Sequence, residues 1–431
     1  MIVQIELQTL PFDPIEAKAS LSQLPTSPAV FALYGDEARD EPYIGRTPNL
    51  RARLERLLQP SPKHPRRLQL AGRVRRIAWR ITGSDFESLL AQFTLLDDIY
   101  GAKALERMHL RSPAFVRYLG GNLYPRIVVT HRPSQREADW AYGPFASRAS
   151  AERFAEEALK LFLLRRCTDD LNPDPSHPGC VYSEMKMCLA PCYKGCSDER
   201  YGEEAAAVES FLASCGESRL VVLRAEREVA STKLEFETAA ALHAQVQRVE
   251  SVRALASELV RPMSQLRGVI LQASASLDEV AVFAFENGSL RGPAAFSTLG
   301  MRIQNEQSGS SSLFAQPMAI EPIPEASEPD SMQPASPRMD AIVTTPPKTA
   351  RGVLEGRLEA ALSFLTESTG STSATIRQGH LALLKRWYYR PEARRTGEIF
   401  FPDAEGRWPI KAILRGVGRV AAKGLSSANR A

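Results

Sequence analysis

Hydrophobic positions change their spacing several times near the start of the chain, and each change predicts a new element. Residues 29–34 are almost continuously apolar, and residues 42–45 follow after a polar stretch, which indicates two strands. Thr47 followed by Pro48 is typical of a helix start, with Thr47 as the N-cap. The helix that we expect there has its apolar stripe at Leu50, Leu54, Leu57 and Leu58.

Alternating and helical patterns continue downstream. Residues 73–81 predict a third strand, and Ser84 to Glu87 reads as a capping box that opens a second helix. That helix has inward positions at Phe86, Leu89, Leu90, Phe93 and Leu96. Further amphipathic helices are expected at 148–166 and 198–213, and a helical hairpin at 217–260.

A β-hairpin is predicted further along the chain. Val280 to Phe285 precedes Asn287-Gly288, and this dipeptide favours the tight turn that joins two antiparallel strands. Strands and helices mixed in this way predict an α+β multidomain protein.

Residues 304–350 differ in composition from the rest of the chain. They hold eight prolines and seven serines, with six acids against two bases. This composition predicts a disordered linker. We expect three domains in the first part of the chain: 1–110 with a small antiparallel sheet and flanking helices, 111–216 with a cysteine-cluster helical module, and 217–260 with the helical hairpin. A segment with the β-hairpin follows at 261–303. After the linker 304–350, residues 351–431 form a mixed, basic C-terminal part.

Length and composition limit the class of protein. A chain of 431 residues predicts two to four domains, and 44% hydrophobic residues suffice for real cores. No run of 18 apolar residues is present, so we expect no membrane partner. The start of the chain lacks the pattern of a secretory signal, and six cysteines are too few for a disulfide scaffold. We therefore expect a cytoplasmic protein with reduced thiols.

The net charge of +4 hides two basic segments. Residues 46–80 carry eleven bases against one acid, and residues 377–431 carry twelve against four. Arginine forks suit phosphate oxygens, so a nucleic acid is the expected partner, although a solvated basic face would look similar. The candidate DNA-binding residues are Arg51, Arg56, Arg73, Arg75 and Arg76.

Four cysteines lie within 26 residues, at Cys167, Cys180, Cys188 and Cys192. Thiolates gathered in this way suit zinc or an iron–sulfur cluster, and their spacing alone leaves the two open. Buried free cysteines are the alternative. Cys196 is a possible fifth ligand, whereas we expect Cys215 to lie in a helix as part of a core.

The sequence around these cysteines resembles UvrC, the excision-repair nuclease subunit. Residues 161–167 and 180–192 carry the likeness, and it continues in register through 198–212 and upstream through 124–127 and 142–145. In UvrC the cysteines hold a [4Fe–4S] cluster, so the resemblance implies that Cys167, Cys180, Cys188 and Cys192 hold one here.

The N-terminal strands resemble a GIY-YIG nuclease domain, a small antiparallel sheet with flanking helices. The resemblance implies catalytic roles for Tyr43, Arg46 and Arg53, and a Mg²⁺ ion if the nuclease is active. Two positions depart from the pattern, because Phe31 replaces a tyrosine and Gln92 stands where the metal-binding glutamate belongs. A neutral amide is a much poorer Mg²⁺ ligand than a carboxylate, so we expect an impaired nuclease.

Three further features bear on this expectation. Leu57 stands where the family has a tyrosine in the first helix, and the asparagine that the family has near 104 is missing. Glu87 could replace the missing ligand only if the register slips.

The hairpin at 217–260 resembles the UVR motif, whose apolar helices pair with a hairpin of UvrB. The resemblance implies a UvrB-like helicase subunit as partner, bound through Leu234, Phe236, Glu237 and Ala240. An ordinary helical hairpin that packs on its own domain is the alternative. His243 reads as a neutral residue on the helix face rather than a ligand.

The likeness is strong over 27–265 and weak beyond, and the RNase H-like nuclease and the helix-hairpin-helix domain of UvrC are expected to be absent. The resemblance thus implies a nucleotide excision repair protein that binds double-stranded DNA and a UvrB-like partner. The alternatives are an active single-incision endonuclease of the UvrC type and a non-catalytic, regulatory DNA-binding protein.

Overall fold

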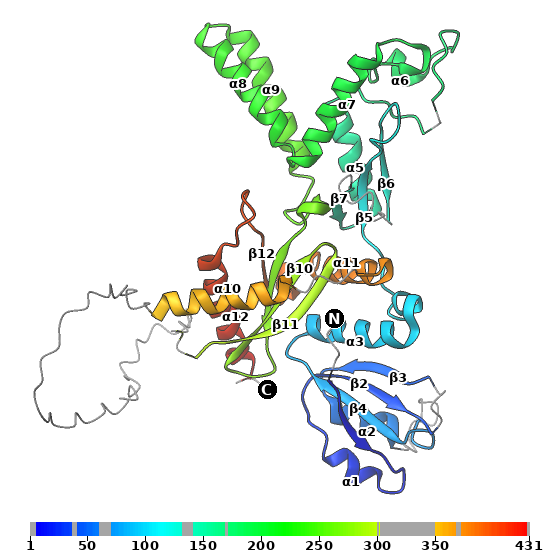
Figure 1. Ribbon diagram of the computed structural model, residues 1–431, viewed down its shortest axis with the longest axis vertical. Helices are drawn as coiled ribbons and strands as arrows, with labels where there is room; N and C mark the ends of the chain where they lie inside the picture. The colour runs from blue at the N-terminus through cyan, green and yellow to red at the C-terminus, as the bar shows by residue number, and fades with distance from the viewer. Residues whose placement is uncertain are drawn as a thin grey trace, which may run out of the picture.

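A computed structural model describes residues 6–36, 41–59, 70–131, 141–168, 171–299, 301, 350–367 and 372–428. Within these ranges the chain forms three four-stranded antiparallel sheets with helices packed against them, which confirms the α+β fold class. The predicted linker at 304–350 lies outside the described residues, except for Ala350. Figure 1 shows two arms that extend from the rest of the molecule. One arm is the helical hairpin, and the other contains the middle sheet and the helices packed on it.

The N-terminal sheet has the strand order β1-β4-β2-β3. Its strands are β1 (Gln8–Pro11), β2 (Ala29–Tyr34), β3 (Tyr43–Thr47) and β4 (Arg76–Ile81). Alternate residues of β2 point to opposite faces. Phe31 therefore packs with α1 (Ala17–Ser22) and α2 (Leu50–Leu58), whereas Val30 packs with α3 (Asp85–Tyr100) on the other face.

The expected start of α2 is wrong by two residues. Thr47 pairs with Ala29 as the last residue of β3, and its hydroxyl bonds to the backbone of Asn49. Asn49 is the N-cap instead, because its Oδ1 accepts from the Ala52 amide at 2.9 Å. Half of the predicted capping box of α3 is present: the Ser84 hydroxyl accepts from the Glu87 amide, but the Glu87 side chain accepts from the Gly83 amide and not from that of Ser84.

A second sheet follows in the middle of the chain, in the order β6-β5-β7-β8. Its strands are β5 (Ala114–Tyr118), β6 (Ile127–Thr130), β7 (Ala141–Phe145) and β8 (Arg261–Pro262). The short η1 (Gly101–Lys103) and α4 (Ala104–Arg107) lead into it. Its apolar face packs against α5 (Arg148–Leu159), which ends seven residues before the predicted 166, and against α7 (Asp198–Ala213). Between these helices lie α6 (Val181–Glu184) and η3 (Pro191–Tyr193).

The helical hairpin consists of α8 (Glu217–Thr232) and α9 (Phe236–Arg253). Its base joins the middle core through Leu220, Leu223, Val246, Val249 and Val252. The expectation that Cys215 lies in a helix is wrong. Cys215 lies in the turn between α7 and α8 and has a φ of 50°.

The third sheet has the order β11-β10-β9-β12. Its strands are β9 (Gly268–Ala273), β10 (Glu279–Glu286), β11 (Ser289–Ser297) and β12 (Glu398–Phe400). The short helix η4 (Met263–Gln265) precedes β9, and η5 (Glu392–Arg394) precedes β12. The predicted Asn-Gly turn joins β10 to β11, and Asn287 and Gly288 both have positive φ. Because β12 pairs with β9, the segments on either side of the linker form one structural unit.

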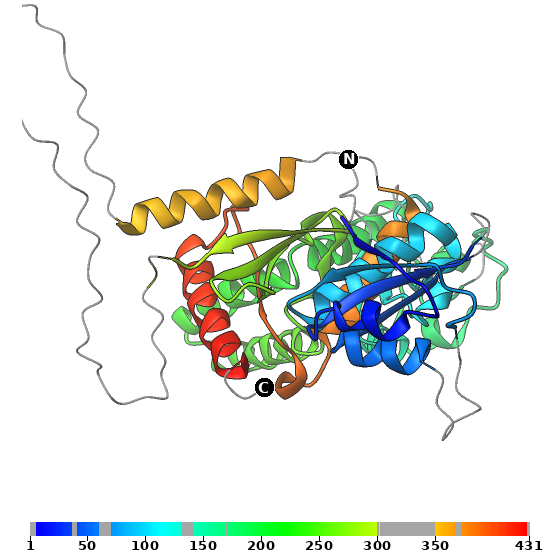
Figure 2. The ribbon, with the colours of Figure 1, turned by 90° about the horizontal axis from the view of Figure 1, so that it is seen from below.

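Helices cover both faces of this third sheet (Figure 2). On one face α10 (Ala350–Glu367) and α12 (Ile410–Ala428) pack against Leu271 and Val282. On the other face α11 (Ala374–Tyr388) shares a core with Phe283 and with α3 of the N-terminal domain. Trp387 and Phe86 meet there with ring centroids 5.3 Å apart, so the N-terminal and C-terminal parts are joined by a common core. No helix in the described ranges is both long enough and apolar enough to cross a membrane.

Candidate functional site

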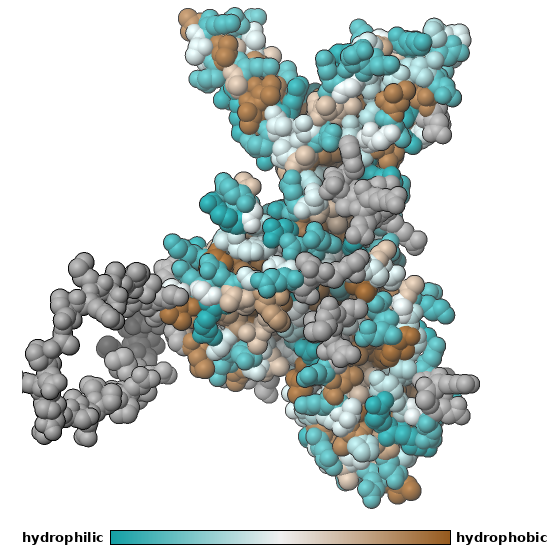
Figure 3. All heavy atoms as spheres, in the orientation of Figure 1, coloured by the Kyte–Doolittle hydropathy of each residue, from teal (hydrophilic) through white to brown (hydrophobic). Residues whose placement is uncertain are grey.

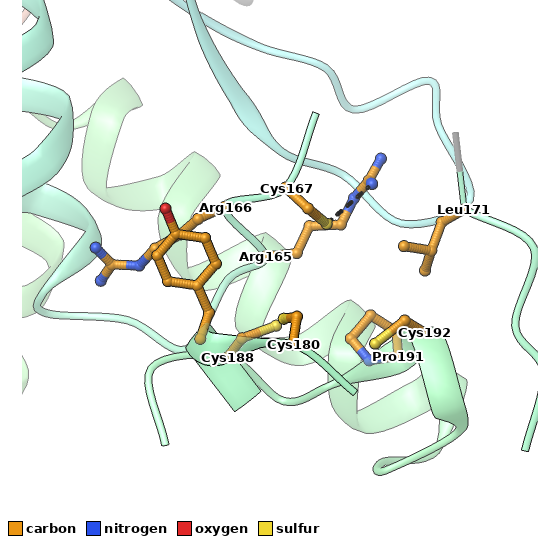
Figure 4. A pocket seen from close by; sticks show the side chains of 9 residues that line it. Arg165, Arg166, Cys167, Leu171, Cys180, Cys188, Pro191 and Cys192 are labelled. Atoms are coloured by element: carbon orange, nitrogen blue, oxygen red, sulfur yellow. Dashed lines mark hydrogen bonds between the residues drawn. The ribbon is translucent and has the colours of Figure 1, made fainter. Parts of the chain in front are cut away.

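The four spaced cysteines converge on one small cavity of ≈ 10 Å³ (Figure 4). That volume is close to the space one water molecule needs. The other side chains that line the cavity are Arg165, Arg166, Leu171, Tyr182 and Pro191. Segments separated by up to 25 residues of sequence are thus folded around a common point that is rich in sulfur.

Short local structures hold each cysteine in place. Cys180 is the N-cap of α6, and Cys192 lies in η3, whose preceding residue Ala190 adopts a left-handed conformation. Two long-range backbone bonds fasten the segment: the Leu189 amide donates to the Leu163 carbonyl at 3.0 Å, and the Asp174 amide donates to the Cys192 carbonyl at 2.9 Å. The cysteine segment is therefore tied to the chain before it.

Burial and the proximity of the other cysteines act on the Cys188 thiol in the same direction. Burial, with a smaller contribution from the neighbouring Cys167, Cys180 and Cys192, raises the pKa of Cys188 to about 11. The Ala190 amide opposes this by donating to Cys188 Sγ at 3.3 Å. Metal ligation requires thiolates, and a bound cation removes the penalty of gathering them.

The donor set bears on which metal group the site can hold. Within the described part of the chain, no three His, Cys, Asp or Glu side chains are placed so that they could hold a single metal ion. The four cysteines line one cavity, and their arrangement does not by itself distinguish zinc from an iron–sulfur cluster.

Arg165 is a neighbour of this site that sequence reasoning missed. Its side chain is buried, its Nε donates to the Tyr124 carbonyl at 2.9 Å, and its Nη1 lies 3.7 Å from Cys167 Sγ. The signal in the sequence was its position two residues before Cys167. Cys196 and Cys215 do not line the cavity, and both pack against the middle core.

The N-terminal domain divides its candidate catalytic residues between two faces of the sheet. Tyr43 packs beside the fully buried Phe31, with ring centroids 6.1 Å apart, in the cluster that also contains Leu57. Arg53 lies half-buried on α2. The hydroxyl groups that Phe31 and Leu57 lack would belong to this same face.

Arg46 lies on the opposite face, where it pairs with Asp85 at the start of α3. Arg390 reaches the same carboxylate from the C-terminal part, with 2.7 Å between its Nη1 and Asp85 Oδ2. Burial alone would raise the pKa of Asp85, but the two guanidinium groups outweigh it and hold the pKa below its usual value. Arg390 is a second residue that sequence reasoning missed.

Gln92 lies half-exposed on α3. The alternative ligand Glu87 is buried, and its Oε2 accepts from the Gly83 amide at 2.9 Å while Arg80 lies 3.8 Å from its other oxygen. Burial raises the pKa of Glu87 despite these contacts. Because Glu87 is engaged by the backbone before its own helix, this face offers a metal ion a neutral amide and no free carboxylate at those two positions.

Four of the candidate DNA-binding arginines lie at one end of the N-terminal domain. The Leu70 amide donates to the Leu57 carbonyl, which places the segment before β4 against the end of α2. Arg56, Arg73, Arg75 and Arg76 are exposed there. Arg75 pairs with Asp36 at 2.8 Å, and Arg76 stacks over Tyr34. Arg51 is half-buried and donates to the Leu24 carbonyl, so it braces the fold.

The tip of the α8–α9 hairpin exposes apolar side chains. Leu234 is 69% exposed and Phe236 is 70% exposed, and Glu237 and Ala240 are exposed beside them. Val221, Val222 and Val229 add to the exposed apolar surface of α8. Figure 3 shows brown areas on the hairpin. His243 contacts Arg227 and Gln247 on the helix surface.

Comparison with known proteins identifies the central segment. Residues 116–211 match the family model of the UvrC/Cho excinuclease middle domain. Proteins named UvrABC system protein C are similar to the chain: that of Alcanivorax borkumensis is 29% identical over 49% of this chain and 34% of its own length. Those of Carboxydothermus hydrogenoformans and Shigella dysenteriae are each 27% identical, over 65% and 56% of this chain and 46% and 41% of their own lengths.

The chain therefore spans less than half the length of these curated relatives. No solved structure gives a significant match. The resemblance to UvrC that the sequence indicated is confirmed.

Proposed function

We propose that this protein works in nucleotide excision repair, where it binds duplex DNA and a UvrB-like helicase subunit and carries an impaired GIY-YIG nuclease site. The observation that carries the proposal is the coincidence of two features in one segment. Residues 116–211 match the UvrC/Cho middle domain, and the four cysteines around one cavity all lie within the matched region.

The cysteine cavity is proposed to hold a [4Fe–4S] cluster through Cys167, Cys180, Cys188 and Cys192. A cluster held there would cross-link these segments of the chain and would provide a group that can accept or release an electron. The chain contributes an amide donor at Cys188 and the buried guanidinium of Arg165 beside Cys167.

DNA binding is proposed to use the exposed arginines before and within β4. Phosphate contacts release counterions, so affinity falls with salt at a slope of about 0.9 per contact. Replacing Arg73, Arg75 and Arg76 with Gln is expected to lower the slope of log K against log salt by roughly 2. Arg75 contributes less than the others because Asp36 already pairs with it.

The measurement is fluorescence anisotropy of a labelled duplex over a range of salt concentrations. The matched control replaces Arg148, Arg200 and Arg224 with Gln, since these are exposed cations of the middle part that pair with acids. An unchanged slope in the first variant would place the DNA surface elsewhere.

The hairpin tip is proposed to bind the UvrB-like partner. Phe236→Ala is expected to weaken this association by about 2 kcal/mol or more, since a buried aromatic ring at the centre of an interface commonly contributes that much. The ring is exposed in the free chain, so the change leaves the fold intact. Isothermal titration against the C-terminal hairpin of a UvrB measures the loss.

Val249→Ala offers the contrast, because Val249 is buried in the middle core at the base of the hairpin and its truncation lowers stability instead. Equal affinity of wild type and Phe236→Ala for the partner would remove the hairpin tip from the interface.

The proposed impairment rests on Phe31, Leu57 and Gln92, which withhold two hydroxyl groups and one carboxylate from the nuclease site. The residues present at the position of the metal ligand do not fit Mg²⁺, so no cleavage step is assigned to the domain. An active single-incision endonuclease is the competing function. The second competing function is that of a regulator that binds DNA but not the UvrB-like partner. The titration with UvrB separates this function from the proposal, because such a regulator would not bind the UvrB hairpin.

A further inference from the structure

The last helix presents a row of cations on one side. In α12, Lys411, Arg415, Arg419 and Lys423 follow one another at intervals of four residues, and all four are exposed. Four residues are slightly more than one helical turn, so the row runs along one flank of the helix. The sequence of α12 contains no acidic residue that would neutralise it.

The opposite side of α12 is fixed in the C-terminal core. The helix lies next to the third sheet and α10 (Figure 2), and its Ile413, Val417 and Val420 are buried in the core that these elements share. Arg419 is engaged by Glu398 of β12 in a two-pronged pair, with N–O distances of 2.8 and 2.6 Å. Among the described residues, Lys411, Arg415 and Lys423 form no ion pair, so three cations of the row are left for a ligand.

The side chains between these cations are small and project little from the helix. Gly418 lies within the same flank, and a Cβ added there would meet no heavy atom within 4 Å. Ala422 is the next residue on that flank, one turn further along. Small residues among cations allow a charged backbone to approach the helix closely.

We infer that the exposed flank of α12 binds the phosphate backbone of a nucleic acid. Successive cations are about 6 Å apart along the axis, on the scale of the separation between neighbouring phosphates of one strand. Lysine and arginine supply donors for phosphate oxygens. A membrane surface fits less well, because the apolar side of α12 is buried and cannot enter a bilayer.

The position of α12 also brings it next to the N-terminal domain. Val420, Ala421 and Gly424 line a cavity of ≈ 300 Å³ together with Ser27, Pro28, Thr82 and Gly83 at the ends of β2 and β4. This cavity is on the buried side of α12, away from the row of cations, so it places the helix next to the N-terminal domain without joining the two basic surfaces. The inference shares its class of ligand with the proposed function but rests on different residues.

The test uses a matched pair of variants of the full chain, Gly418→Glu and Gly418→Gln. The two side chains have the same length and differ in charge, and both are better helix formers than glycine. In anisotropy with a labelled duplex at about 0.1 M salt, Gly418→Glu is expected to bind roughly fivefold more weakly than Gly418→Gln. The difference should shrink as salt is raised.

A second variant replaces Lys411, Arg415 and Lys423 with Gln. Its salt slope is expected to fall by about 2 to 3, and the Arg148, Arg200 and Arg224 control keeps the wild-type slope. Circular dichroism verifies that each variant is folded. Equal affinities of the Gly418 pair together with an unchanged slope would overturn the inference.

Vesicles of phosphatidylcholine and phosphatidylserine supply the competing surface. Loss of vesicle binding in the α12 variant with DNA binding intact would likewise overturn the inference. If the variant at Arg73, Arg75 and Arg76 keeps the wild-type salt slope, the DNA-binding surface proposed for the N-terminal domain is contradicted. The result for α12 does not depend on that variant.

Discussion

Cys188→Ala is expected to abolish the iron–sulfur chromophore and to unfold the cysteine segment. Burial, together with the neighbouring Cys167, Cys180 and Cys192, raises the pKa of Cys188 to about 11. A metal site that forms only in the folded state adds its binding energy to folding, about 10–16 kcal/mol for structural zinc sites. Removing one ligand therefore costs far more than an ordinary core truncation of about 2–5 kcal/mol.

The measurement is visible absorbance, with iron and sulfide analysis, on protein purified without oxygen. The wild type should be brown and contain about four iron and four sulfide per chain. Limited proteolysis should then cut the variant between 167 and 196, where the wild type resists.

Cys215→Ala is the matched control for this experiment. Cys215 is a half-buried thiol of the same module that does not line the cavity, so its loss should leave colour and iron content unchanged. A colourless wild type containing one zinc per chain would contradict the iron–sulfur assignment. Equal loss of iron in both variants would show that the effect of Cys188→Ala is not specific to the cavity.

Gln92→Glu combined with Phe31→Tyr is expected to give partial nicking of duplex DNA in Mg²⁺, whereas the wild type binds DNA without cutting it. A carboxylate returns a charged oxygen ligand to α3, and a metal ion there bears the charge that builds on the phosphate and leaving oxygen. Since a metal ion contributes several kcal/mol and each 1.4 kcal/mol is tenfold, the increase should be about a hundredfold or more.

Phe31 is fully buried, and a Cβ on Gly45 would lie 2.8 Å from its ring. A hydroxyl added there loses stability unless it finds a partner, so melting of the double variant is measured beside its activity. Gln92→Ala with Phe31→Tyr is the control, since it offers neither carboxylate nor amide. It should stay inactive.

Nicking by the wild type that survives Gln92→Ala but disappears in Glu87→Ala would show that the register on α3 is wrong. Nicking that survives both changes would place the metal site off this helix. If the double variant is folded and still inactive, Gln92 and Phe31 are not the sole causes of the impairment, and Leu57 becomes the next position to change.

Elements with strong local signals could be predicted from the sequence. The helix at 198–213 and the hairpin at 217–260 are confirmed because their apolar positions recur at helical spacing over many residues. The Asn-Gly turn is confirmed because few dipeptides adopt two positive φ angles. Strands β5, β6 and β7 escaped prediction, since each has at most five residues and so carries only a short hydrophobic pattern.

The candidate sites divide in the same way. The cysteines could be found because their spacing is recorded in a single stretch of chain. The pairing of Arg46 and Arg390 with Asp85 could not, because it joins residues 39 and 305 positions apart through the packing of α11 on α3. The engagement of Glu87 by Gly83 was also hidden, since a capping box predicts a bond to the Ser84 amide instead.

The central claim is that this chain joins a UvrB-like subunit on DNA without cutting the strand. A native mobility-shift experiment with damaged duplex, preloaded with UvrB and supplied with Mg²⁺, tests it most directly when the shifted band is excised and its DNA is run under denaturing conditions. The account predicts a further shift when the chain is added, with an intact strand, and loss of that shift in Phe236→Ala. A band that does not move, or a strand that is cut, would contradict it.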